Sequence, residues 1–63
     1  MTNLKIMRQL KGLSQKGLAQ KMNLKQASVC DQERKGIYDI RTAKKYAKAL
    51  ECSAIFVLEE LGS

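Results

Sequence analysis

The sequence contains no histidine, no proline and no tryptophan, and it has only two cysteines. Histidine is the most common general base and the usual imidazole ligand of metals, so its absence argues against most enzymes and metal sites. Two cysteines are too few for a disulfide scaffold or a closed four-thiolate zinc site. We therefore predict a non-enzymatic protein without metal or cofactor, in which Cys30 and Cys52 are reduced, buried thiols. A disulfide between them is the alternative.

The sequence also lacks a long apolar run. No stretch approaches the roughly 20 apolar residues of a membrane span, and no signal-peptide pattern follows Met1. A chain of 63 residues has room for one small core, because it buries only about 60% of its unfolded surface. These features predict a single cytoplasmic domain over residues 1–63 with no membrane partner, to which dimerisation would add stability.

Positive charge is in excess and is unevenly distributed. Twelve Lys and Arg oppose six Asp and Glu, a formal net charge of +6. Residues 1–50 carry all twelve cations and three acids, a net charge of +9, whereas residues 51–63 carry three acids and no cation. A basic body with an acidic, apolar end suggests a polyanionic partner on one side. A solvated, lysine-rich surface is the alternative explanation.

Apolar residues recur with a helical period along the whole chain, and no segment alternates as a strand does. The pattern predicts helices over residues 4–10, 15–22, 26–34, 41–50 and 54–61. Ser14 is a candidate N-cap of the second helix, and Gly12 and Asn23 suit left-handed turns. The predicted apolar faces are Leu4, Ile6, Met7 and Leu10; Leu18, Ala19 and Met22; and Ala43, Tyr46, Ala47 and Leu50.

Two short helices separated by a three-residue break at 23–25 have the outline of a helix-turn-helix. Residues 12–22 read GLSQKGLAQKM, which closely resembles the G-L-S-Q-x-x-L-A signature of the lambda repressor/Cro-type (XRE-like) helix-turn-helix family. The resemblance continues without a gap through ASV at 27–29, ER at 33–34 and AKAL at 47–50. It implies an all-α, compact five-helix lambda-repressor-like domain that binds DNA, with the helix-turn-helix at helices 2 and 3.

The resemblance also implies which residues touch DNA. It places base contacts at Gln26 and Ala27, whose amide and methyl groups suit adenine and a thymine methyl. Asp31 lies one turn further on, where a carboxylate can accept from cytosine N4; alternatively, its charge only repels phosphate at wrong sites. Arg41 either contacts the minor groove or backbone or is simply solvated. The predicted phosphate contacts are Gln15, Lys25, Ser28, Arg34, Lys35 and Arg41.

One charged pair is expected to be structural. Arg8 and Glu33 match the family's buried bridge between the first and third helices. Such a bridge need not add net stability, because desolvation of the two charges offsets their attraction. Removing one partner leaves the other charge buried alone and is costly, so we expect Glu33→Ala to loosen the fold.

The last predicted helix carries adjacent bulky apolar residues. By the resemblance, its core positions are Ala54, Val57 and Leu58, which leaves Ile55 and Phe56 outside the small core. Exposed apolar patches usually mark interfaces. We therefore predict a two-fold dimer contact formed by Ile55, Phe56 and Leu61, although one of the first two side chains packing under its own loop is an alternative.

Taken together, the residues and the resemblance predict a sequence-specific transcriptional regulator of double-stranded DNA. The expected protein is a Cro-like repressor of a phage or similar mobile element, which occupies a near-palindromic operator as a homodimer and takes no small-molecule ligand. One alternative is a protein-interaction module of the same fold, antitoxin-like or inhibitory, that uses the apolar C-terminal helix. An RNA-binding regulator is a weaker alternative, because two tyrosines and one phenylalanine offer few surfaces for base stacking.

Overall fold

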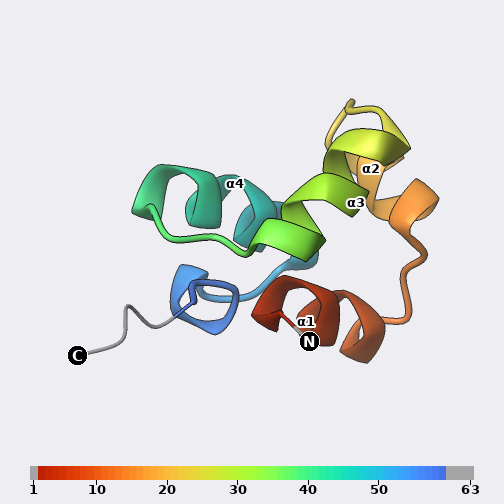
Figure 1. The fold of residues 1–63 in the computed structure, drawn as a ribbon. Coiled ribbons are helices and arrows are strands. Elements are labelled where there is room, and N and C mark those ends of the chain that lie inside the picture. Colours follow the sequence, from red (N-terminus) through yellow and green to blue (C-terminus); the bar gives the residue numbers. More distant parts are fainter. Residues whose placement is uncertain (1, 60–63) are drawn as a thin grey trace.

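Four α-helices and one 3-10 turn form the regular structure of residues 2–59, the part of the chain that the computed structural model describes (Figure 1). No strand occurs within those residues, as the sequence pattern predicts. The four α-helices begin and end within one residue of the predicted bounds. The elements are α1 (Asn3–Leu10), α2 (Gln15–Lys21), α3 (Gln26–Lys35), α4 (Ile40–Leu50) and the 3-10 turn η1 (Ala54–Phe56).

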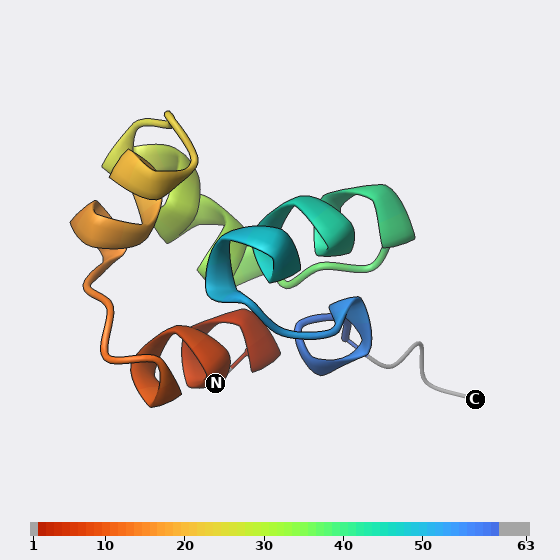
Figure 2. The same cartoon turned by 180° about the vertical axis from the view of Figure 1, so that it is seen from behind.

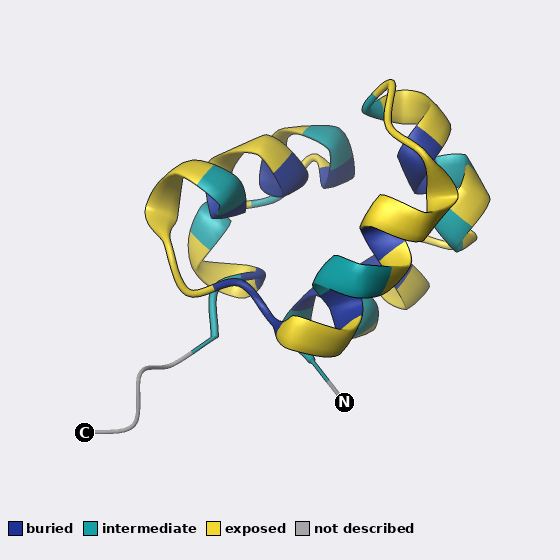
Figure 3. Ribbon diagram, turned by 45° about the horizontal axis from the view of Figure 1, so that its top comes forward, coloured by how far each residue is buried: buried dark blue, intermediate teal, exposed yellow. Residues whose placement is uncertain are grey.

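The helices form two layers. In Figure 1, and from behind in Figure 2, α1 and η1 lie on one side of the molecule, and α2, α3 and α4 lie on the other. Each helix has a buried side and an exposed side (Figure 3). The largest fully buried side chains come from each of the four α-helices and from the segments outside the helices: Leu4, Leu18, Val29, Ile37, Leu50 and Val57.

Local sequence explains where the helices begin and end. The Ser14 hydroxyl accepts a hydrogen bond of 2.9 Å from the Gly17 N–H and so caps α2, as expected. The Asp39 carboxylate caps α4 by accepting 2.8 Å from the Thr42 N–H. The left-handed turns predicted at Gly12 and Asn23 are present, with φ of 72° and 58°.

The predicted core faces are correct for α4 and only partly correct for α1. All four predicted residues of α4 are buried, and Leu18 and Ala19 are buried on α2, with Met22 packed at the edge of the core. On α1, however, Ile6 is exposed and Leu10 is 72% exposed. The buried side of α1 consists of Leu4 and Arg8, one turn apart, and this orientation turns Leu10 toward solvent.

The predicted fifth α-helix is not formed through residue 59. Only Ala54–Phe56 is helical, as a single 3-10 turn, and its N-cap Ser53 makes no side-chain cap bond. An α-helix would pair the Glu59 N–H with the carbonyl of Ile55, but this N–H instead donates 2.7 Å to the Ile37 carbonyl. The contact with the α3–α4 loop therefore replaces a continuing helix. Leu61, which ended the prediction, lies outside the described residues.

The prediction that both cysteines are buried is wrong for Cys30. Both are free thiols, Cys52 is half-buried, and Cys30 is exposed. Val29 and Glu33 occupy the inner face of α3, and Cys30, one residue beyond Val29, is rotated about 100° away from that face.

Candidate nucleic-acid interface

The α2–α3 corner presents the first turn of α3 to solvent. The Leu24 N–H donates 2.8 Å to the Ala19 carbonyl and closes the turn after α2. Lys25 then adopts extended backbone and precedes α3 without a side-chain cap bond. All of the predicted DNA-contacting residues in this stretch are exposed: Lys25, Gln26, Ala27 and Ser28.

The outer face of α3 is polar and charged. Val29 and Glu33 are buried against the rest of the molecule. Ala27 and Asp31 lie roughly opposite them at 100° per residue, and Arg34 and Lys35 are exposed in the last turn. The structure thus places Ala27 and Asp31 on the outer face of α3, whereas Gln26 is exposed because it begins the helix.

A buried network fixes α1, α2 and α3 to one another. The Arg8 guanidinium donates to both oxygens of the Glu33 carboxylate through Nε and Nη2, and its Nη1 donates 2.6 Å to the Leu13 carbonyl. Arg8 and Glu33 are only 8% and 5% exposed. The Thr2 hydroxyl adds a bond of 2.6 Å to the Glu33 carbonyl. Thr2 and Arg8 therefore hold Glu33 in place, and its carboxylate is not available at the protein surface.

Gln15, a predicted phosphate contact, belongs to the same network. Its Nε2 donates 3.0 Å to Glu33 Oε1, and it is the first residue of α2. The bond uses one of the two amide hydrogens and leaves the other available to an external acceptor. The buried Glu33 carboxylate thus orients the Gln15 amide at the edge of the candidate interface.

Three of the predicted DNA contacts pair with one another. The Asp31 carboxylate accepts 2.7 Å from Arg34 Nη2 and lies 2.9 Å from Lys35 Nζ. The hydrogen bonds from Lys35 and then from Arg34 lower the pKa of Asp31 below its ordinary value of 3.8. Asp31 is therefore ionised at neutral pH, and it offsets one of the two positive charges at the end of α3.

A cleft of about 360 Å³ opens where α1, α2 and α3 meet. Lys5 of α1 lies in the same cleft as Gln15 and Arg34. Cys30, which sequence reasoning assigned to the core, also lines this cleft. Nothing in the local sequence indicates these two positions, because the cleft depends on how three helices pack. Its lining residues are Thr2, Lys5, Gln15, Cys30, Glu33 and Arg34.

The other predicted site residues lie away from α3. Arg41 is exposed in the first turn of α4. Ile55 and Phe56 are 71% and 58% exposed on η1, so neither packs under its own loop. Leu61, the third residue of the predicted dimer contact, lies outside the described residues.

Neither a membrane-spanning helix nor a metal-ligating cluster occurs over residues 2–59. No helix in this range is long and apolar enough to cross a membrane. Within the same residues, no group of three or more Cys, Asp or Glu side chains is arranged to hold a metal ion.

Comparison with known proteins gives one match. A family model described as helix-turn-helix matches residues 4–57, which is most of the chain and runs from the second residue of α1 to the residue after η1. No curated protein and no solved structure matches the chain significantly.

Proposed function

Because the chain belongs to the lambda repressor/Cro-type helix-turn-helix family of DNA-binding regulators, we propose that it is a sequence-specific repressor that occupies its operator as a dimer. In this proposal α2 and α3 form the helix-turn-helix, and α3 enters the major groove. Residues 1–63 act as a single cytoplasmic domain without a cofactor, as in a Cro-like protein of a phage or other mobile element.

The exposed first turn of α3 is the observation that carries this proposal. Gln26 and Ala27 are exposed there, and Val29 and Glu33 anchor the buried side of the same helix. A glutamine amide can bond adenine N6 and N7, and an alanine methyl can contact a thymine methyl. Asp31 either accepts from cytosine N4 or repels phosphate at wrong sites.

The proposed phosphate contacts flank the residues that would contact the bases. Gln15 has one amide hydrogen remaining, and Lys25 and Ser28 flank the start of α3. Arg34 and Lys35 lie at its other end, where Asp31 holds both side chains. Contacts of this kind fix the register of the protein on the duplex but carry no sequence information directly. Arg41 is proposed as a further contact to the backbone or minor groove.

The exposed apolar residues of η1 support the dimer. A two-fold contact through Ile55 and Phe56 would withdraw both side chains from water and would place two copies of α3 one DNA turn apart, about 34–36 Å. Phe56→Glu should then abolish dimerisation on DNA in sedimentation experiments. Leu10→Glu is the matched control, because Leu10 is an apolar residue of α1 that is even more exposed than Phe56. Equal effects of both changes would contradict this interface.

Selection from randomised duplex DNA tests the whole proposal. We expect enrichment of a near-palindromic site with half-sites about one turn apart, with affinity that falls steeply between about 50 and 200 mM salt. Gln26→Ala should relax one base position in each half-site. Gln20→Ala, an exposed glutamine on α2, should leave the selected sequence unchanged.

Weak, unselective binding that moderate salt abolishes would overturn the proposal. The alternative of a protein-interaction module would then be favoured, because the exposed apolar side chains of Ile55 and Phe56 could bind another protein. Circular dichroism of each variant shows whether a lost activity reflects a lost fold.

A further inference from the structure

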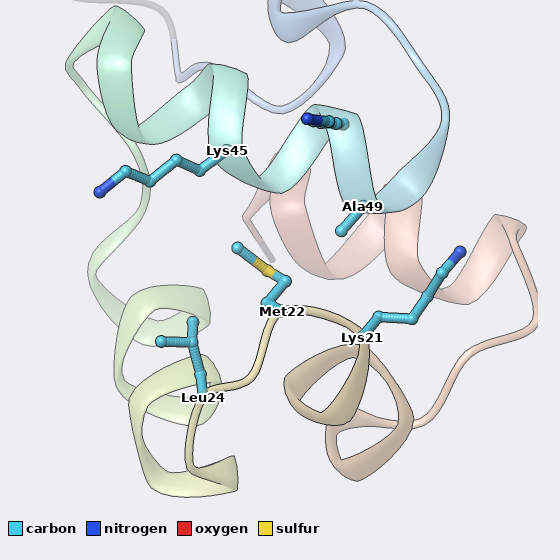
Figure 4. A pocket seen from close by; sticks show the side chains of 6 residues that line it. Lys21, Met22, Leu24, Lys45 and Ala49 are labelled. Carbon is cyan, nitrogen blue, oxygen red and sulfur yellow. The ribbon is translucent and has the colours of Figure 1, made fainter.

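A second surface, separate from the outer face of α3, has its own chemistry. A groove of about 640 Å³ runs between the end of α2 with its following turn and the C-terminal half of α4 (Figure 4). Figure 1 shows α3 on the near side of the molecule, whereas Figure 2 shows this half of α4 on the near side. The groove is lined by Lys21, Met22, Leu24, Lys45, Lys48 and Ala49.

The centre of the groove is apolar. The Met22 and Leu24 side chains project into it from the turn after α2, and Ala49 faces them from α4 (Figure 4). Leu24 is 42% exposed, a high value for a leucine next to the core. The small Ala49 side chain leaves space that a larger residue would fill. These three residues form an open apolar floor.

Lysines stand on both sides of this floor. Lys45 and Lys48 lie one turn apart on α4, and Lys21 ends α2 on the opposite wall. No acid lines the groove, and the salt bridges within residues 2–59 involve none of these lysines. Three positive charges around an apolar floor are complementary to a ligand with carboxylates on its edges and apolar side chains between them.

We propose that this groove binds an acidic amphipathic peptide segment of a partner protein. Apolar side chains of the segment rest on Met22, Leu24 and Ala49, and its carboxylates meet the lysines on either side. A helix laid into a groove, with apolar anchors spaced i, i+3, i+4 and i+7, is a common mode of peptide recognition. A nucleic acid backbone would satisfy the lysines but offers the floor only the C–H groups of its sugars, so a peptide with larger apolar side chains is the better match.

The site does not rest on the proposed operator binding, because it uses neither α3 nor the residues assigned to DNA. A regulator with both surfaces would bind DNA through one face and a partner through the other. The two activities can therefore fail independently, and each has its own readout.

Fluorescence anisotropy with synthetic peptides tests the groove. The probe is a labelled helical peptide with leucine at i, i+3, i+4 and i+7 and glutamate elsewhere, compared with the same peptide carrying glutamine in place of every glutamate. We expect the acidic probe to bind more tightly. Lys45→Glu combined with Lys48→Glu should weaken its binding by about tenfold or more, as two lost and reversed ion pairs imply.

A matched pair of charge reversals controls for net charge. Lys11→Glu with Lys44→Glu changes two exposed lysines outside the groove and should have a much smaller effect on the probe. Leu24→Ser should weaken the probe without altering any charge. Thermal unfolding of each variant confirms that the fold is retained.

Three results would overturn the proposal. The first is equal binding of the acidic and glutamine probes by the parent protein, and the second is equal weakening by the two double variants. The third is a selective loss of duplex DNA affinity in Lys45→Glu/Lys48→Glu without binding of the peptide, which would assign the groove to nucleic acid.

Discussion

The backbone N–H of Asn3 donates a hydrogen bond of 2.6 Å to the Glu59 carboxylate, so the segment after η1 caps the start of α1. The Asn3 side chain also donates 3.0 Å to the Leu58 carbonyl. Thr2, the local N-cap residue, makes no side-chain cap bond, and its hydroxyl donates to the Glu33 carbonyl. The first helix therefore obtains its capping acceptor from a residue 56 positions away.

Glu59→Ala should destabilise the domain by about 1–2 kcal/mol, the usual effect of losing a helix cap. The variant leaves the Asn3 N–H without its acceptor and removes the side chain that covers this helix end. Urea unfolding followed by circular dichroism measures the change. Glu59→Gln retains an acceptor oxygen and should lose less; an equal loss in both variants would show that charge rather than hydrogen bonding matters.

Glu33→Ala should destabilise the domain by about 3–5 kcal/mol, because the Arg8 guanidinium would remain buried without its partner. A chain of this size has little stability to spare, so the variant should be largely unfolded and should bind DNA poorly for that reason. Thermal unfolding measures the effect. Arg34→Ala removes an exposed ion pair and should change the midpoint far less; an unchanged midpoint in Glu33→Ala would contradict the prediction.

The segment from Gly12 to α3 was the most predictable part of the fold. Its caps and turns depend on residues close in sequence: Ser14 reaches the Gly17 N–H three residues away, and Asn23 takes a left-handed conformation in place. The inner face of α4 was predictable for a similar reason, since four apolar residues at helical spacing leave one side to bury. In these two parts of the fold, residues close in sequence determine the conformation, so the sequence alone predicts it.

The C-terminal segment was not predictable in the same way. The Glu59 N–H pairs with Ile37, and a Cβ on Gly36 would lie 2.8 Å from Glu59 Cγ. This close approach of two distant segments replaces the helix that local apolar spacing favoured. Within the candidate site, the exposed residues of α3 can be predicted from the sequence of that helix alone. The position of Lys5 in the same cleft as Gln15 cannot, because it depends on how separate helices pack.

Asn23→Ala should destabilise the domain by about 1 kcal/mol, because a residue with a Cβ and no polar side chain is strained at φ of 58°. Asn23→Gly should be neutral or slightly stabilising in the folded state, since glycine adopts positive φ without steric cost. Chemical denaturation of both variants measures the difference. Equal stability of the two would show that the turn between α2 and α3 is not held in this conformation in solution.

The Asp39 cap of α4 should weaken in acid. The backbone hydrogen bond from Thr42 lowers the pKa of Asp39 below its ordinary value of 3.8. A lowered folded-state pKa means that the stabilisation by the charge is complete above pH 3.8 and is lost as pH falls through the folded-state pKa. Asp39→Asn should therefore melt below the parent at neutral pH, and the two midpoints should converge in acid. A difference between the two midpoints that does not change with pH would contradict a role for the Asp39 charge.

Asp31→Asn should raise affinity for random duplex DNA more than for the selected operator. In the free protein the Asp31 carboxylate holds Arg34 and Lys35, so removing its charge releases both cations toward phosphate. The slope of log affinity against log salt should steepen by about 0.9, as for one additional phosphate neutralised. Glu51→Gln, which removes one exposed acid at the far end of α4, is the matched control for net charge.

If Asp31→Asn instead alters the preference at one base pair and leaves random-duplex affinity unchanged, Asp31 contacts cytosine directly. The two roles assigned to this residue thus differ in a measurable way: repulsion of phosphate weakens binding to non-operator DNA whatever its sequence, whereas a base contact acts at one position of each half-site.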